Sequence, residues 1–341
     1  MPRRFANALL ARRVAPALVA PALAAAVLGA AGLAGCGAPQ RATAPTPRAG
    51  LGTAPGVAAH ASDAAPGAPS VAPASAYAVG SREISVNRGG TRPMQTTIWY
   101  PATGRAGGAP RGGPPVASGR FPVVIFSHGL TGLPGDYRAL LTRWAAAGLV
   151  VVAPAYPHTS RGVARFDVLD VINQPADASY ALGKVLALDG AAGDPLRGHL
   201  RRDRVAAGGH SAGAITTVGL FTAGRDERLV AGVVLAGNAV GVGDSFTGRA
   251  APLLFVHGEA DQVTPYGLAR AAYARAPWPK AFLTMPREGH IDPYLRPDAP
   301  AFRAVAATTT DFLRWALYGD ATAKARLGRD AARAGTLANR L

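Results

Sequence analysis

Apolar residues beyond about position 81 follow two patterns that alternate along the chain. Short runs of consecutive apolar residues, such as 121–127 and 149–153, are typical of strands buried on both faces of a sheet. Between these runs, apolar residues recur with helical spacing, as at Tyr137, Leu140 and Trp144. The predicted strands cover 83–86, 94–100, 121–127, 149–153, 204–208, 229–236, 252–257 and 280–285. The predicted helices cover 136–147, 176–188, 212–221, 265–276 and 300–318.

This order of elements predicts an α/β fold. Strands that alternate with helices need right-handed crossovers, which give a mainly parallel sheet with helices on both faces. The first two strands fit an antiparallel pair at the edge of that sheet. The connection 237–251 is too short for a helical lid, so we expect an open, shallow cleft. The tail beyond Asp320 is expected to be a loose helix.

The start of the chain has the pattern of an export signal. Residues 1–13 contain four arginines and no acid, and 14–33 are almost all Ala, Val and Leu, as in a basic n-region and an apolar h-region. Leu33-Ala34-Gly35-Cys36 then resembles the bacterial lipobox, which implies cleavage before Cys36 and lipidation of its thiol. The alternative is an uncleaved membrane anchor with an incidental cysteine.

The domain organisation follows from these patterns. We predict a lipoprotein signal peptide over 1–35, and a lipidated Cys36 with a disordered tether rich in Ala, Pro and Gly over 36–80. A catalytic domain is predicted over 81–320, followed by a C-terminal tail over 321–341. A lipidated, tethered protein would act outside the cytoplasmic membrane, held to it through its acyl chains.

Composition and charge exclude several classes of protein. A chain of 341 residues with 49% hydrophobic and 16% charged residues is globular rather than disordered. Its single cysteine excludes an intrachain disulfide framework and a Cys-rich zinc site. The formal net charge is +16, and nearly all of the positively charged residues are arginines. No basic run carries interleaved aromatics, so we expect no nucleic-acid partner. A diffuse positive field favours weak attraction to anionic lipid.

The clearest chemical motif is Gly209-His210-Ser211-Ala212-Gly213, which matches G-x-S-x-G between a predicted strand and a predicted helix. A serine on such a sharp turn needs neighbours with almost no side chain. The motif places the hydroxyl at a helix N-terminus, where developing negative charge is favoured. We therefore predict that Ser211 is a nucleophile rather than an ordinary turn serine.

A nucleophilic serine needs a histidine base and a carboxylate that holds the tautomer of that base. His290 follows the last predicted strand and Asp261 follows the strand before it, so the order is Ser, Asp, His. Glu259 and Asp244 are alternative acids. Asp292 is too close to His290 in sequence to approach its far nitrogen. His158 could line the cleft, and His210 is expected to pack or form hydrogen bonds beside the turn.

Backbone amides are the expected donors to the oxyanion of an acyl-transfer intermediate. Ser127-His128-Gly129-Leu130-Thr131-Gly132 leaves a strand into a glycine-rich turn that can face the nucleophile. We assign the two donors to the amides of Leu130 and Ala212. His128 is expected to shape the turn rather than to react.

With these motifs, residues 81–320 resemble the α/β-hydrolase esterases. The resemblance is strongest to the bacterial group related to platelet-activating-factor acetylhydrolase, chlorophyllase, dienelactone hydrolase and the cutinase-like polyester hydrolases. It rests on the elbow around Ser211 and on four further segments, 126–130, 150–154, 174–177 and 257–261. Dienelactone hydrolases use a cysteine nucleophile. Polyester hydrolases usually carry methionine after the serine and a disulfide, so polyester cleavage is not expected here.

The resemblance implies a serine carboxylesterase without a metal or organic cofactor, acting on a small-molecule or lipid ester. Short-acyl or surface-presented esters would suit an open cleft. Two other classes use the same residues. One is a non-catalytic surface binding protein with this fold, and the other is a peptidase or thioesterase. The sequence carries no signal for an oligomeric state.

Overall fold

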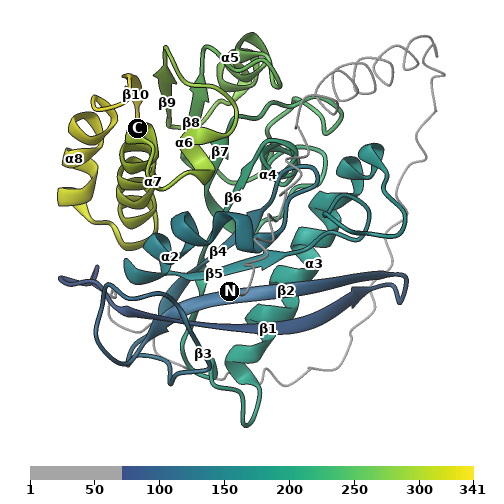
Figure 1. Ribbon diagram of the computed structural model, residues 1–341, viewed down its shortest axis with the longest axis vertical. Coiled ribbons are helices and arrows are strands. Elements are labelled where there is room, and N and C mark those ends of the chain that lie inside the picture. The colour runs from purple at the N-terminus through teal and green to yellow at the C-terminus, as the bar shows by residue number, and fades with distance from the viewer. Residues whose placement is uncertain (1–70) are drawn as a thin grey trace, which may run out of the picture.

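The computed structural model describes residues 71–341, and its centre is a single sheet (Figure 1). Within these residues the strand order is β10-β9-β8-β7-β6-β4-β5-β2-β1-β3. The strands are β1 (Ala78–Arg88), β2 (Arg92–Ala102), β3 (Arg111–Gly112), β4 (Phe121–Ser127), β5 (Val150–Pro154), β6 (Leu200–His210), β7 (Leu229–Leu235), β8 (Leu253–Gly258), β9 (Lys280–Met285) and β10 (Thr336–Arg340).

The pairing of the strands confirms the predicted α/β fold. Six neighbouring strands, from β5 through β4, β6, β7 and β8 to β9, pair in parallel. The predicted pair β1 and β2 is antiparallel and joins this block through β5. Parallel strands place their carboxyl ends at one edge of the sheet, so the loops that follow β4, β6, β8 and β9 gather there.

Helices cover both faces of the sheet. They are α2 (Arg138–Ala146), α3 (Gln174–Ala187), α4 (Ala212–Gly219), α5 (Tyr266–Arg275), α6 (Asp292–Leu295), α7 (Pro300–Tyr318) and α8 (Ala321–Ala331), with 3₁₀ turns η3 (Pro134–Tyr137), η4 (Val168–Asn173) and η5 (Leu188–Gly190). Buried residues of α3, α4 and α5 form one apolar cluster, and those of α2, α7 and α8 form the other.

Each strand of the parallel block contributes to both clusters, because successive side chains of a strand point to opposite faces. In β4, Val123 and Ile125 belong to the first cluster, whereas Val124 and Phe126 belong to the second. All seven residues of β4 are buried. This explains why the strand reads in the sequence as a continuous apolar run rather than as an alternating one.

Two predicted boundaries differ from the structure. The predicted domain start at Ser81 lies inside β1, and ordered packing already includes Tyr77, whose N–H donates to the carbonyl of Ala146 at 2.9 Å. The tail beyond Asp320 is not a loose helix. Its helix α8 packs on α7, and β10 pairs antiparallel with β9. Asp320 caps α8 by accepting the N–H of Ala323, which fixes where this helix begins.

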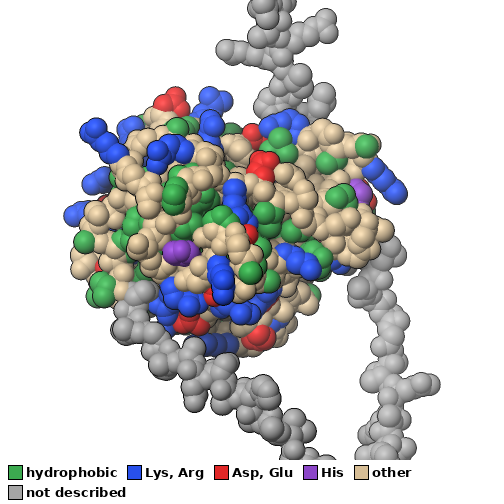
Figure 2. All heavy atoms as spheres, turned by 90° about the horizontal axis from the view of Figure 1, so that it is seen from below, with side chains coloured by type: hydrophobic (Ala, Val, Ile, Leu, Met, Phe, Trp, Pro, Cys, Tyr) green, Lys and Arg blue, Asp and Glu red, His purple; other side chains and the backbone are tan. Residues whose placement is uncertain are grey.

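The connection between β7 and β8 contains no helix, so the prediction that a large lid is absent is confirmed. The predicted signal peptide, Cys36 and the tether up to residue 70 lie outside the described residues. Between residues 71 and 341 no helix has both the length and the apolar character to cross a membrane. On the face seen in Figure 2, Lys and Arg side chains are spread over the surface with acidic side chains among them.

Candidate active site

Ser211 lies at the sharp turn between β6 and α4, with φ 59° and ψ −123°. A side chain at Gly209 would overlap the carbonyl of Gly213, and one at Gly213 would overlap the carbonyl of Ser127. Both positions therefore accept only glycine, as the sequence motif implied. The turn holds Ser211 in a backbone conformation that non-glycine residues rarely adopt, and it presents the hydroxyl beside the start of α4.

The three side chains predicted from chain order lie in contact. His290, in the loop between β9 and α6, places Nε2 2.8 Å from Ser211 Oγ and Nδ1 2.7 Å from Asp261 Oδ2. An ionised carboxylate can only accept, so Nδ1 carries the ring proton and Nε2 is free to accept from the serine hydroxyl. Ser211 is 6% exposed and His290 8% exposed, so both residues are almost entirely withdrawn from water.

Asp261 is held as a carboxylate. Its Oδ1 accepts the N–H groups of Val263 and Thr264, both at 2.8 Å. Burial raises the pKa of this carboxyl, but hydrogen bonds from His257 and His290 outweigh burial, and the pKa lies well below its usual range. The carboxylate therefore stays charged at any pH at which His290 could act as a base.

The alternative acids lie elsewhere. Asp244 forms an exposed ion pair with Arg275 at 3.4 Å, and Asp292 pairs with Arg296 at 2.6 Å. Glu259 is exposed. Among the acids weighed from the sequence, Asp261 is the one whose carboxylate contacts His290.

One contact of Asp261 was missed by sequence reasoning. His257, at the end of β8, is 1% exposed, and its Nε2 lies 3.2 Å from Asp261 Oδ2 and 2.9 Å from the carbonyl of Thr264. The carboxylate is thus approached by two imidazoles. The sequence signal for this contact was the spacing of four residues between His257 and Asp261. That spacing alone does not show whether His257 contacts Asp261 or is only a buried residue at the end of a strand.

The loop after β4 packs against Ser211. A Cβ on Gly129 would lie 3.1 Å from Ser211 Cβ, so this backbone passes directly beside Ser211. The carbonyl of Gly129 bonds His128 Nδ1 at 2.8 Å and the N–H of Gly132 at 3.0 Å. In a trans peptide the N–H points opposite to the carbonyl, so these bonds aim the N–H of Leu130 away from His128.

The two amides assigned to the oxyanion have no acceptor among residues 71–341. The amide of Ala212 belongs to the first turn of α4, where N–H groups have no partner within the helix. The amide of Leu130 is oriented by the turn described above. Both groups are therefore available to a ligand, in a place where the helix dipole favours negative charge.

The remaining histidines of this region have structural partners. His128 Nε2 bonds the N–H of Tyr156 at 3.2 Å and Ser160 Oγ at 3.0 Å, so Nδ1 carries the proton donated to Gly129. This agrees with the expected role in shaping the turn. His158 Nδ1 bonds the carbonyl of Arg165 at 3.1 Å and does not contact Ser211.

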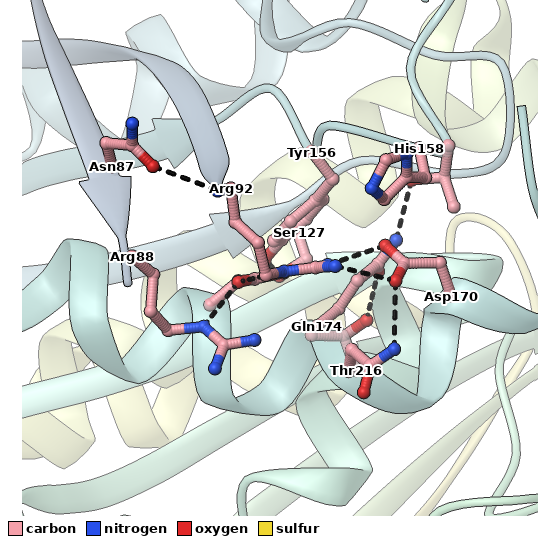
Figure 3. A network of polar contacts seen from close by, with 12 residues as sticks. Asn87, Arg88, Arg92, Ser127, Tyr156, His158, Asp170, Gln174 and Thr216 are labelled. Atoms are coloured by element: carbon pink, nitrogen blue, oxygen red, sulfur yellow. Dashed lines mark hydrogen bonds and ion pairs between the residues drawn. The ribbon is translucent and has the colours of Figure 1, made fainter. Parts of the chain in front are cut away.

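Gln174 and Thr216, drawn in Figure 3, belong to a buried polar network that links α4 to the loop containing Leu130. Gln174 accepts the hydroxyl of Thr216 in α4 at 2.5 Å and donates to Thr159 Oγ1 at 2.6 Å. The carbonyl of Thr159 in turn accepts the N–H of Thr131 at 2.7 Å. Gln174 and Thr159 therefore connect α4 to the turn that contains Leu130.

Arg92 of β2 forms a second buried cluster, made of ion pairs (Figure 3). Its guanidinium contacts the buried carboxylates of Asp170 and Asp177, each at 2.6 Å, and Arg88 also reaches Asp177 at 2.7 Å. A buried carboxylate needs such partners because desolvation of an unpaired charge is costly. Figure 3 shows the two arginines entering from the antiparallel pair at the sheet edge.

Two buried neutral histidines predict a pH dependence of stability. Burial lowers the pKa of His128 to about 4, and burial with the nearby His290 lowers that of His210 well below its ordinary value. An unfolded histidine takes up a proton near pH 6.5, so below that pH the unfolded state binds more protons. The free energy of unfolding should fall from pH 7 to pH 5, by up to about 1.4 kcal/mol per pH unit for each histidine.

Urea unfolding at half-unit pH intervals measures this slope. A stability that stays constant or rises on acidification from pH 6.5 to pH 5 would contradict the neutral assignment of the two rings.

No group of three or more His, Cys, Asp or Glu side chains in the described part of the chain is arranged to hold a metal ion.

The family described as platelet-activating factor acetylhydrolase, isoform II, matches residues 108–175. The matched segment contains β4, β5, η4 and the loop of Leu130, and it ends before Ser211. No curated protein matches the chain. The match supports an α/β-hydrolase-like fold and a hydrolase of ester substrates.

Proposed function

We propose that the protein is a serine carboxylic-ester hydrolase with Ser211 as nucleophile, His290 as general base and Asp261 as the orienting acid. The observation that carries the proposal is the unbroken hydrogen-bonded series from Asp261 Oδ2 through His290 to Ser211 Oγ, with links of 2.7 and 2.8 Å. This geometry satisfies the distances that a nucleophile, base and acid need to act together.

In the proposed reaction, Ser211 Oγ attacks the ester carbonyl while His290 Nε2 takes its proton. The amides of Leu130 and Ala212 donate to the oxyanion that forms, and each such donor typically contributes about 10² to 10³ in rate. His290 then gives its proton to the departing alcohol, which leaves an acyl group on Ser211. Water, activated by the same imidazole, releases the acid and restores the enzyme.

The environment of Ser211 supports a preference for short acyl groups. The nucleophile is 6% exposed, and no helix of the β7–β8 connection provides an apolar roof for a long chain. With nitrophenyl esters we expect kcat/KM to be highest for acetate to butyrate and to fall with longer chains. A strong preference for long acyl chains would contradict this.

Labelling with a fluorophosphonate tests the enzyme class directly, because the probe reacts with an activated serine. We expect one adduct, located on Ser211 by mass spectrometry. A protein that carries no adduct and hydrolyses no ester in the series would instead be a binding protein with this fold.

We also propose that Cys36 is lipidated and that the domain acts outside the cytoplasmic membrane. The support is the sequence pattern of a basic stretch, an apolar stretch and Leu33-Ala34-Gly35-Cys36. In a bacterial host, Cys36→Ser should move the protein from the membrane fraction to the soluble fraction or leave its precursor uncleaved. Incorporation of labelled palmitate into this variant at the wild-type level would overturn the proposal.

A further inference from the structure

His210, the residue before the proposed nucleophile, belongs to a series of three hydrogen bonds that joins two loops. His210 forms two of these bonds and Tyr137 forms the third with Gly129. His210 Nε2 lies 2.8 Å from the carbonyl oxygen of His290, and His210 Nδ1 lies 2.8 Å from Tyr137 Oη. Tyr137 Oη also accepts the N–H of Gly129 at 3.1 Å. His210 is 2% exposed and Tyr137 is 2% exposed, so water does not compete for these bonds.

The direction of each bond follows from the groups involved. A carbonyl oxygen can only accept, so His210 Nε2 carries the ring proton. Nδ1 of the neutral ring must then accept, and Tyr137 is its donor. Since the hydroxyl proton of Tyr137 is used in this way, its oxygen is left to accept from Gly129. The series therefore runs one way, from Gly129 through Tyr137 and His210 to the carbonyl of His290.

The two ends of this series are the two loops that the proposed reaction needs. Gly129 precedes Leu130, whose amide is one assigned oxyanion donor, and His290 is the assigned base. The ring of His210 also contacts the ring of His290, with centroids 4.8 Å apart. Loss of one internal link would leave two buried polar groups without partners, which costs about 1 to 3 kcal/mol each.

We propose that His210 and Tyr137 are positioning residues that hold the oxyanion loop and the imidazole of His290 in register across Ser211. This inference rests on the proposed function and adds to it. It explains why a large buried imidazole occupies the middle of a turn whose neighbouring glycines accept no side chain.

The neutral state of His210 is part of this arrangement. Its pKa lies well below the ordinary value because of burial and the nearby His290. When His290 takes the proton of the serine, His210 therefore remains neutral. Nδ1 keeps accepting from Tyr137, and the series stays intact through the reaction.

Three variants separate the links. Tyr137→Phe removes the central hydroxyl. In His210→Asn the amide has the reach of Nδ1 alone, so the bond to Tyr137 survives and the bond to His290 is lost. In His210→Gln the amide has the reach of Nε2 alone, so the bond to His290 survives and the bond to Tyr137 is lost. Tyr100→Phe is the matched control, because its hydroxyl is bonded to the carbonyl of Pro114 at 2.9 Å in a buried place remote from Ser211.

We expect Tyr137→Phe and His210→Asn each to lower kcat by about 10- to 100-fold, the equivalent of a lost buried hydrogen bond, with KM changed less than threefold. His210→Gln should lower kcat to about the same extent as Tyr137→Phe, and combining these two changes should cost little more than either alone, because both break the same bond. The double variant Tyr137→Phe, His210→Asn should lose less than the product of the two single losses, because both changes break one series. Tyr100→Phe should retain wild-type kcat.

Two results would overturn the inference while the wild-type protein hydrolyses esters. One is a kcat within twofold of wild type in both Tyr137→Phe and His210→Asn. The other is a double variant Tyr137→Phe, His210→Gln whose loss in kcat equals the product of the two single losses, which indicates that the two side chains do not act through one bond. If one variant does not fold by circular dichroism, the remaining pair decides. A wild-type protein without turnover and without a fluorophosphonate adduct would instead refute the proposed function.

Discussion

Replacing Ser211 with alanine should lower kcat for ester hydrolysis by about 10⁶-fold, the loss typical of removing a nucleophile that acts together with its base. The variant keeps Cβ, so the turn at φ 59° gains no new strain and the hydrogen bond from the N–H of Ser211 to Leu235 is retained. Fluorophosphonate labelling should disappear with the activity. Steady-state kinetics and the midpoint of thermal unfolding measure the two effects separately.

Ser179→Ala is the control for this variant. Ser179 lies on α3, and its hydroxyl donates to Asp226 at 2.8 Å, away from the elbow. Its loss should leave ester turnover at the wild-type level. Turnover by Ser211→Ala within tenfold of wild type would show that another group attacks the ester.

The second large effect is expected from Asp261→Asn, which should lower kcat by about 10⁴-fold because the base loses the group that sets its tautomer. Asp261 accepts on both oxygens, from Val263 and Thr264 on one side and from His290 and His257 on the other. An asparagine presents an NH₂ group to one of these sides in either orientation. A donor then faces donors, so either the turn or His290 loses its partner.

Asp244→Asn is the matched control, since Asp244 is one of the two alternative acids and lies in an exposed ion pair with Arg275. It should change kcat by less than twofold, because exposed ion pairs contribute little. Equal losses in the two variants would contradict the assignment of Asp261. Measurement of kcat across pH 6 to 9 distinguishes a lost base from a merely shifted optimum.

The parallel sheet could be predicted closely because its strands are buried on both faces. Predicted and observed bounds coincide for β4, β9 and α7, where continuous or helically spaced apolar residues begin and end sharply. The β10 strand escaped prediction because four of its five residues are exposed, so it shows no apolar pattern. Its pairing with β9 is a tertiary property that local sequence does not carry.

The candidate site also has a part that could be predicted from the sequence and a part that could not. Ser211, Asp261 and His290 were predictable because the glycine motif and the order of strand ends place them at one edge of the sheet. The contacts around them were not. Tyr137 and His210 are 73 residues apart, and Arg92 and Asp177 are 85 residues apart, so no local pattern links the members of either pair. Such partners depend on how helices and loops settle onto the sheet.

The last strand of the chain is also the border of the sheet. Because β10 lies outside β9, it occupies backbone groups that would otherwise be open to another molecule. Shortening the chain by its final ten residues would remove β10, expose the unpaired backbone N–H and C=O groups of β9 at the edge of the sheet, and promote self-association of the folded protein.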